Sequence, residues 1–408
     1  MTFVVHSFPS TSQTFIDRQI TGLLDLGHEV RILAERRPQD PVLHPAVREY
    51  GLQEKVTYVH EEELGRRALG AVIGRLMLRK PSALGLLRRD RAARSGGRRV
   101  VCDRVKTLLD ASPTDVLHYH FGYVGLRYAE VGRELGIPQI VSFYGWDCSG
   151  LPRQRGEDLY EPLFRGVDRV TVLSDNMKAR LMELGCPPEL LRIHHLGVDP
   201  SEYAHRERVH PAPGEPVRLL TVARLVEKKG VEYCLQAVAQ VLASRGEAAR
   251  GLRYDVIGDG PLRGDLEARA SELGLDDSVR FHGSQDQEAV RRAMMSAHLF
   301  LLPSVTAEDG DQEGTPTVLV EASSTGLPVL STWHSGIPEI VLDGQTGFLV
   351  PERDADALAE RLGHLLDHPE LWQTMGRDGR RHIEESFATP SLSRELVQHY
   401  RDIMESGG

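Results

Sequence analysis

Cysteine is scarce and scattered in this sequence. The chain of 408 residues has four cysteines, at Cys102, Cys148, Cys186 and Cys234, and they form no CxxC pair. Disulfide frameworks and zinc sites both need clustered cysteines. We therefore expect neither, and a reducing cytoplasm is the natural compartment.

The chain also lacks an excess of positive charge and a long apolar run. Its formal net charge is −10 at pH 7, whereas nucleic-acid binders present clustered Lys and Arg to the phosphate backbone. No stretch of about 18 apolar residues occurs, and the first residues, TFVVHSFPS, lack the basic and apolar regions of a signal peptide. We expect a cytoplasmic protein that binds no nucleic acid and does not span a membrane.

Short runs of β-branched residues do occur throughout, and they alternate with longer helical patterns. This alternation is typical of parallel sheets covered by helices on both faces. The predicted strands are 3–6, 29–33, 56–59, 116–119, 139–143, 170–173 and 192–195, then 218–222, 254–257, 279–281, 299–302, 329–331 and 348–350. The predicted fold class is α/β, with two doubly wound, Rossmann-like domains.

The two series of strands are separated by residues 199–216, which hold four prolines and no apolar periodicity. This composition predicts an interdomain linker between an N-terminal domain at 1–198 and a C-terminal domain at 217–388. Ligands bind outside the carboxyl ends of the strands in open α/β sheets. Two such domains facing each other would make a deep cleft. The last segment, 389–408, has a helical pattern.

Two carboxylates flank an expected helix start in the segment EGTPTVLVE, from Glu313 to Glu321. Pro316 suits a first helical turn, so Glu313 is expected in the preceding loop and Glu321 about two turns in, roughly 12 Å away. One carboxylate could accept hydrogen bonds from a sugar and the other from a ribose. Between them, a diphosphate would be stabilised electrostatically by the free N–H groups around Gly314, Thr315, Thr317 and Val318.

Two further segments accompany this motif: VARLVEKKG, from Val222 to Gly230, and HSGIPEIVLDGQTGFLVP, from His334 to Pro351. In content, order and spacing, this half of the chain resembles the retaining glycosyltransferases of family 4, whose two-domain GT-B fold carries a Glu-x7-Glu motif. The longer segment DGDQEGTPTVLVEASSTGLPVLST most resembles enzymes of bacterial exopolysaccharide assembly, of the colanic-acid type. The resemblance implies an acceptor-binding first domain, a donor-binding second domain, and a final helix that packs back on the first.

The resemblance also assigns roles to residues of the second domain. Arg224 and Lys229 would stabilise negative charge on the departing diphosphate, while Glu313 would orient the sugar and Glu321 the ribose. IGDGPLRG, residues 257–264, is a near miss to the dinucleotide fingerprint, with its third glycine one position late. We interpret it as a turn near the nucleotide, and we expect Gly283 and Ser284 to lie close to the base.

In the first domain, His118 and His120 fall on the same face at the end of a predicted strand. The resemblance places His120 near the donor sugar, where it could donate to a hydroxyl or shield positive charge at the anomeric carbon. His118 is interpreted as a buried histidine satisfied by its surroundings.

Two other segments of the first domain are candidate acceptor contacts. SFYGWDCS, residues 142–149, resembles a cleft segment in which many relatives have His where Tyr144 stands. The loop SFPSTSQTF, residues 7–15, has hydroxyl side chains where many relatives have a glycine pair, so hydroxyls are expected to replace close backbone contacts. The candidates are Tyr144, Trp146 and Asp147, and Ser10, Thr11 and Ser12.

No metal and no cofactor are expected beyond the nucleotide-sugar co-substrate. DGD, residues 309–311, looks like the metal motif of another glycosyltransferase fold, but a basic pair already serves the diphosphate. No Ser, Cys or His arrangement predicts a covalent nucleophile. By resemblance, the departing phosphate oxygen itself would take the acceptor proton while the new bond forms on the same face of the sugar.

Residues 66–99 hold eleven Lys or Arg and one acid, Asp90, interleaved with apolar residues. Basic amphipathic segments settle on anionic membranes, each basic residue contributing about 1 kcal/mol. We expect peripheral contact with the inner face of the membrane; an arginine-rich solvated helix pair is the alternative.

Together these features predict a retaining transferase that moves a hexose from a nucleotide diphosphate sugar, uridine being favoured over guanosine, to a saccharide or lipid-linked acceptor in polysaccharide or glycoconjugate biosynthesis. Two alternatives stay open. A nucleotide-sugar epimerase of the same fold would turn over the donor without an acceptor. A non-catalytic sensor would bind the nucleotide sugar and leave it intact.

Overall fold

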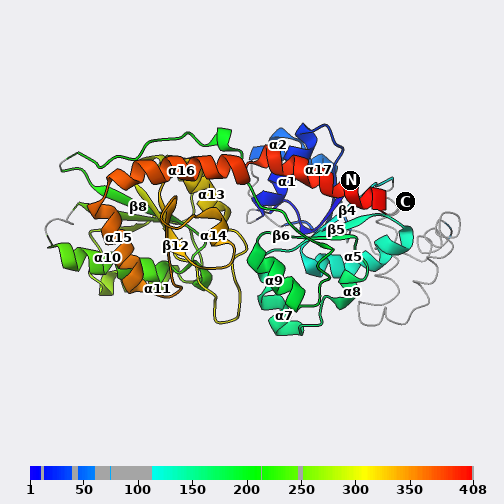
Figure 1. Ribbon diagram of the computed structural model, residues 1–408, viewed down its shortest axis with the longest axis horizontal. Helices are drawn as coiled ribbons and strands as arrows, with labels where there is room; N and C mark the ends of the chain where they lie inside the picture. Colours follow the sequence, from blue (N-terminus) through cyan, green and yellow to red (C-terminus); the bar gives the residue numbers. More distant parts are fainter. Residues whose placement is uncertain are drawn as a thin grey trace. The chain divides into compact units, whose positions relative to one another are not determined.

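The computed structural model describes residues 1–10, 13–38, 45–59, 74, 113–212, 214–246 and 251–406. The chain forms two compact units, one of Met1–His194 with Pro390–Gly408 and the other of His195–Thr389 (Figure 1). The first unit is therefore built from both ends of the chain, and the second from its middle.

The first unit has a parallel sheet whose seven described strands lie in the order β3-β2-β1-β4-β5-β6-β7. The strand order reverses between β1 and β4, which is the switch point of a doubly wound sheet. The strands are β1 (Thr2–Ser7), β2 (Arg31–Arg36), β3 (Val56–Tyr58), β4 (Leu117–His120), β5 (Gln139–Ser142), β6 (Arg169–Val172) and β7 (Leu191–Ile193).

Helices flank this sheet, and one of them comes from the end of the chain. Leu396, Tyr400 and Ile403, on one face of α17, share an apolar cluster with Phe3 of β1 and Ile20 of α1. The described helices of the unit are α1 (Thr14–Asp25), α2 (Pro45–Glu49), η1 (Leu52–Lys55), α5 (Gly122–Leu135), α6 (Gly145–Cys148), α7 (Gly150–Arg155), α8 (Glu161–Phe164), α9 (Asp175–Glu183) and α17 (Thr389–Ser406).

The second unit has a parallel sheet whose six described strands lie in the order β10-β9-β8-β11-β12-β13. Both faces are apolar because neighbouring residues of one strand enter opposite cores, as Leu219 and Leu220 of β8 do. The strands are β8 (Val217–Val222), β9 (Leu252–Ile257), β10 (Val279–Phe281), β11 (Leu299–Leu302), β12 (Val329–Thr332) and β13 (Gly347–Val350).

The helices of the second unit cover both faces of its sheet. Helices α10, α11 and α15 contribute to one core, α12, α13 and α14 contribute to the other, and α16 contributes to both. Their bounds are η4 (Pro200–Glu202), η5 (Glu227–Lys229), α10 (Val231–Arg245), α11 (Arg263–Glu272), α12 (Gln287–Ser296), α13 (Thr317–Ser324), α14 (Ile337–Ile340), α15 (Ala355–Asp367) and α16 (Glu370–Ser386).

The predicted α/β fold class is confirmed, and each predicted strand overlaps an observed one. The largest displacement is at β2, predicted at 29–33 and observed at Arg31–Arg36. The strand runs on because Glu35 is buried rather than exposed: its carboxylate is paired with His6, at 2.7 Å, and with Arg127. No helix in the described ranges combines the length and the apolar composition that a membrane crossing requires.

Residues 199–216 are not a free linker, which corrects the sequence-based interpretation. The described part of this segment belongs to the second unit. Tyr203 is part of its core, and the buried guanidinium of Arg208 donates to the carbonyl oxygens of Met294 and Thr325, at 3.0 and 3.1 Å. The chain passes between the units at His194 and His195 instead.

Two glycines of α16 give a matched test of how this helix packs on the turn that follows α13. A Cβ at Gly376 would lie 2.1 Å from the backbone oxygen of Gly326, whereas a Cβ at Gly379 would meet nothing closer than 3.6 Å. Gly376→Ala should therefore destabilise the protein by about 1–3 kcal/mol through overpacking. Gly379→Ala should stabilise it by up to about 1 kcal/mol, because alanine favours the helix. Urea unfolding midpoints compare the two, and equal effects would contradict the described packing of α16.

Candidate functional site

The candidate residues of the second unit follow its strands. Because β8 to β13 are parallel, their carboxyl ends share one edge of the sheet. Arg224 and the lysines of η5 come after β8, Gly258 after β9, Gly283 after β10, and the Glu313 loop after β11. We call this side of the unit the carboxyl edge.

The loop after β8 depends on a glycine. Gly230 has φ +61°, and a Cβ there would lie 1.9 Å from the backbone oxygen of Pro303, just beyond β11. Only glycine allows this approach. The contact brings Lys228 and Lys229 beside the chain that leaves β11.

Lys229 and Glu313 form a buried ion pair at this place. The Lys229 Nζ lies 2.8 Å from Glu313 Oε1, and the two side chains are 14% and 9% exposed. Burial raises the pKa of the Glu313 carboxyl, but Lys229 and Lys228 outweigh burial and hold that pKa below its usual value. Sequence reasoning selected both residues but not their contact with each other.

Lys228 is a residue that sequence reasoning missed. Its Nζ lies 2.9 Å from Asp311 Oδ2 and donates to the carbonyl oxygen of Gln312 at 3.3 Å. The second carboxylate of the DGD segment is therefore engaged by a lysine. The available signal was the additional basic residue of EKKG together with an acid two positions before Glu313.

Arg224 differs from the two lysines in its surroundings. Its side chain is exposed, and among the described residues it has no ion pair or side-chain hydrogen bond. The exposed guanidinium of Arg224 has donors that could bind a carboxylate or phosphate in a bidentate geometry.

The start of α13 differs from the prediction. Pro316 is the N-cap residue, with ψ 106°, and the helix begins at Thr317. Glu321 is thus the fifth residue of the helix, just over one turn in rather than two. The 12 Å estimate does not apply, because Glu313 to Pro316 lie outside the helix and do not rise at the helical rate.

Donor groups nevertheless gather at this helix start. Thr317 and Val318 are in the first turn, where N–H groups have no carbonyl four residues earlier in the helix. The buried hydroxyl of Thr315 has no hydrogen-bond partner among the described residues. The carbonyl of the adjacent Gly314 accepts from Gly336 N at 3.2 Å. Polar groups that face an anion with their N–H and O–H ends suit a phosphate.

The turns after β9 and β10 are tied together. Gly258 N donates to the carbonyl oxygen of Gly283 at 2.9 Å, and Gly283 adopts φ +66°. Ser284 next to it is exposed. IGDGPLRG therefore forms a turn at the carboxyl edge, and contact of Gly283 and Ser284 with a base stays a prediction.

In the first unit, His120 ends β4 and is buried. Its Nδ1 is 2.7 Å from the Tyr144 hydroxyl, and its Nε2 has no hydrogen-bond partner in the described part of the chain. Burial lowers the pKa of His120 to about 3, so the ring is neutral at pH 7. His118 instead uses both ring nitrogens, on the Tyr400 hydroxyl and on Ser142 Oγ, each at 2.7 Å.

Asp147 has a structural task that sequence reasoning did not reveal. Its two carboxylate oxygens accept from Gly122 N and Tyr144 N, each at 2.6 Å. Burial raises the pKa of Asp147 to about 7, although these two backbone donors oppose the rise. Trp146 packs its ring against Gly150, where a Cβ would lie 2.0 Å from a ring carbon.

The remaining first-domain candidates are only partly described. The carbonyl oxygen of Ser10 accepts from Gln13 N at 3.1 Å. Thr11 and Ser12 lie outside the described residues, as do Cys102 and, except for Gly74, the basic stretch 66–99.

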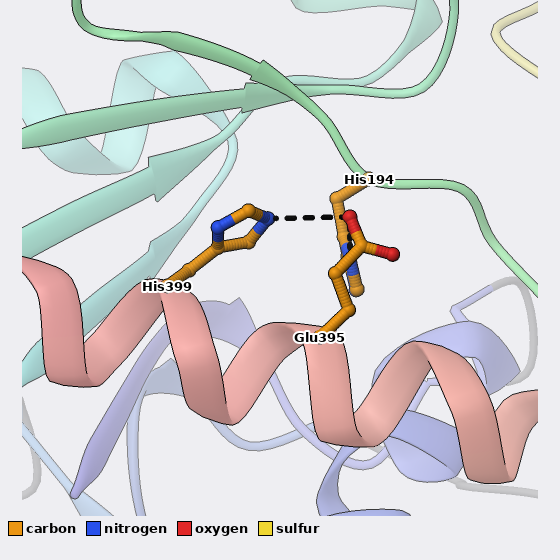
Figure 2. Close-up of side chains that lie close together, drawn as sticks. All are labelled: His194, Glu395 and His399. Carbon is orange, nitrogen blue, oxygen red and sulfur yellow. Dashed lines mark ion pairs between the residues drawn. The ribbon is translucent and has the colours of Figure 1, made fainter.

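Outside the candidate site, a cluster of side chains with metal-ligand spacing lies where the chain leaves the first unit. Figure 2 shows His194, just after β7, facing Glu395 and His399 of α17. Glu395 Oε1 lies 3.8 Å from His194 Nδ1 and 3.4 Å from His399 Nε2. Both imidazoles lower the pKa of the Glu395 carboxyl.

The protonation of His399 argues against a metal at this cluster. Arg169 Nη1 lies 3.3 Å from His399 Nδ1, and a guanidinium can only donate. The ring proton is then on Nε2, the atom that faces Glu395, and no lone pair is presented there to a cation. We interpret the cluster as a structural contact that holds α17 against the rest of the first unit.

Comparison with known proteins places both halves of the chain. A model of "Glycosyl transferase 4-like domain" matches residues 10–197, and one of "Glycosyl transferases group 1" matches residues 204–382. A colanic acid biosynthesis glycosyltransferase, WcaL, of Salmonella typhimurium is 36% identical over 97% of this chain and 98% of its own length. The amylovoran biosynthesis glycosyltransferase AmsK of Erwinia amylovora is 33% identical over 88% of each chain.

Solved structures agree on the fold. Anabaena Alr3699/HepE in complex with UDP has a TM-score of 0.74 at 16% identity, covering 98% of this chain and 99% of that one. Sucrose-phosphate synthase from Thermosynechococcus elongatus has a TM-score of 0.73 at 18% identity, covering 99% of both. Taken with the sequence relatives, which match 97% and 88% of this chain, these findings show that the chain belongs to the glycosyltransferase family that joins a 4-like domain to a group 1 domain in a GT-B fold.

Proposed function

We propose that this protein is a retaining hexosyltransferase of exopolysaccharide assembly, which uses a nucleotide diphosphate sugar as donor and a saccharide or lipid-linked sugar as acceptor. The observation that carries the proposal is the buried Lys229–Glu313 pair, which lies at the same carboxyl edge as the start of α13 and the exposed Arg224. A cation and a carboxylate held together in this way match the two ends of a diphosphate sugar. The names of the relatives, in colanic acid and amylovoran biosynthesis, support the pathway class.

Each group has a task in the proposed transfer. As the bond from the anomeric carbon to the phosphate oxygen breaks, negative charge grows on the departing diphosphate, where Arg224, Lys229 and the first-turn N–H groups of α13 stabilise it. Glu313 accepts from sugar hydroxyls, and Glu321 from the ribose. The departing oxygen takes the acceptor proton, and the acceptor oxygen bonds to the same face of the oxocarbenium-like sugar.

His120 is assigned to the reacting sugar. The ring is neutral at pH 7 because burial lowers its pKa to about 3, and its Nε2 has no protein partner within the described residues. A neutral imidazole with one nitrogen on Tyr144 can offer the other to a sugar hydroxyl. No step is assigned to a metal, since Asp311 of the DGD segment is paired with Lys228.

Uridine diphosphate is the proposed nucleotide. Solved HepE structures hold UDP, or UDP-glucose, which supports this choice over guanosine. An epimerase would release its nucleotide sugar without an acceptor, and a sensor would bind it unchanged, so the dependence of product on acceptor separates the three functions.

Removing the Glu313 carboxylate should abolish most of the transfer. We expect Glu313→Ala to lower release of nucleoside diphosphate from its donor by about 100-fold, since an interaction made at the reacting sugar is lost. Release is measured from a panel of UDP-, GDP- and ADP-sugars, with membrane extract as acceptor.

The control for this variant is Glu308→Ala, which removes an exposed carboxylate from the same loop and should change release by less than about twofold. Wild-type release that does not depend on the extract would contradict the transferase proposal. Equal effects of the two variants would contradict the role of Glu313.

Arg224 should act on nucleotide affinity and not on stability. Arg224→Gln removes an exposed cation, so we expect UDP to bind about tenfold more weakly, with an unchanged unfolding midpoint. Arg280→Gln, an exposed arginine on β10, is the matched control and should leave UDP affinity unchanged. Calorimetric titration with UDP decides, and an unaltered affinity in Arg224→Gln would remove Arg224 from the site.

A further inference from the structure

His334, two residues after β12, contacts the backbone of Glu313 in a way that fixes the tautomer of the His334 ring. The backbone N–H of Glu313 points at His334 Nε2, at 3.0 Å. A backbone N–H can only donate, so Nε2 must carry the lone pair. The ring proton of neutral His334 is therefore on Nδ1, which lies 2.6 Å from Glu352 Oε1.

Glu352, two residues after β13, uses both of its oxygens. Oε1 accepts from His334 and, at 3.5 Å, from the Thr306 hydroxyl, and Oε2 accepts from the backbone N–H of Thr306 at 2.8 Å. Burial raises the pKa of Glu352, but the bonds from His334 and Thr306 outweigh burial and lower it. One carboxylate thus ties the end of β13 to the loop after β11.

The segment around His334 supports Glu313 a second time. Gly336 N donates to the carbonyl oxygen of Gly314, at 3.2 Å. Ser335, between His334 and Gly336 in the chain, is held at φ +45°, in the left-handed region. His334 itself is 1% exposed, so the ring is enclosed by protein. The segment 334–336 thus contacts the backbone at both Glu313 and Gly314.

We propose that Glu352 and His334 form a positioning relay for donor use: Glu352 fixes the His334 tautomer, and His334 in turn fixes the backbone of Glu313. The proposal rests on the proposed role of Glu313 toward the donor sugar. Both residues act through Glu313 and are positioning residues. The chain of contacts predicts that a change at Glu352, three contacts from the sugar, weakens recognition of the sugar more than that of the nucleotide.

Glu352→Gln is a sharp test because it keeps size and removes one acceptor. The amide oxygen can serve His334 or Thr306, but its NH₂ group must then face the other donor. If NH₂ faces His334, the ring proton moves to Nε2 and opposes the N–H of Glu313. If it faces Thr306, the loop loses its contact with β13. Either arrangement disturbs the relay with no change in volume.

The expected kinetic result is a selective one. Glu352→Gln should lower kcat/KM for the nucleotide sugar chosen by the donor panel about tenfold, a loss typical of one charge-assisted hydrogen bond. Affinity for UDP alone should stay within about threefold, because UDP has no sugar to present to Glu313. His334→Gln should have a similar effect, and the double variant should be no worse than the more severe single variant.

Glu227→Gln is the matched control. Glu227 also ties the loop after β11, since both of its oxygens accept from Glu308 N, at 3.1 and 3.0 Å. An amide retains one of these acceptors and has no contact with His334. The ion pair of Glu227 with Arg353 is partly exposed and contributes little, so kcat/KM should change by less than about twofold. A loss equal to that of Glu352→Gln would show that general loosening of the loop is responsible, which overturns the relay.

The tautomer can be read without any donor. In the protein labelled with ¹⁵N-histidine, long-range ¹H–¹⁵N spectra should show one ring, missing in His334→Gln, with its proton on Nδ1, and Glu352→Gln should change that signal. A proton on Nε2 in the wild type would overturn the relay.

Failure of the proposed function is seen separately. If the wild type releases no nucleoside diphosphate from any donor, the affinity of UDP-glucose relative to UDP in the same variants reads the relay. An unchanged ratio in Glu352→Gln overturns it.

Discussion

The ion pair between Lys229 and Glu313 is the interaction around which the carboxyl edge of the second unit is arranged. Both charges are largely buried, and a buried charge without a partner is strongly destabilising. The pair therefore balances both charges before a donor is present. For the proposed donor, binding is an exchange of partners, in which phosphate oxygens replace the carboxylate at lysine and sugar hydroxyls replace lysine at the carboxylate. Little new charge has to be desolvated.

Other charges at this edge are already committed to one another. Lys228 is held by Asp311, and Glu352 by His334. Glu227 pairs with Arg353, at 3.2 Å. These contacts hold the loops after β8, β11, β12 and β13 in one arrangement. Arg224, which has no ion pair with any described residue, remains available for an incoming anion. Loops held in this way, with an unpaired guanidinium at Arg224, favour recognition of the proposed diphosphate over general attraction to anions.

Most of the fold could be read from the sequence because parallel strands buried on both faces are continuous runs of Val, Ile and Leu. The local motif around Glu313 was also readable, since its residues are close in sequence. The pairings were not, because Lys228 and Asp311 are 83 residues apart and meet only through the sheet. The interpretation of residues 199–216 as a linker was wrong for a related reason. Arg208 is buried because its guanidinium donates to backbone carbonyl oxygens, and such hydrogen bonds leave no periodic pattern in the sequence.

The origin of α17 has a consequence for how the chain matures on the ribosome. The strands of the first unit are synthesised early, but the helix that closes their core is synthesised only after the whole second unit. Until then, Phe3 and Ile20 lack the covering side chains of Leu396 and Ile403, and His118 lacks its Tyr400 partner. The second unit can therefore complete its own core first, while the first unit still exposes an apolar surface. Chaperones bind such exposed apolar surfaces, and without enough chaperone these surfaces aggregate.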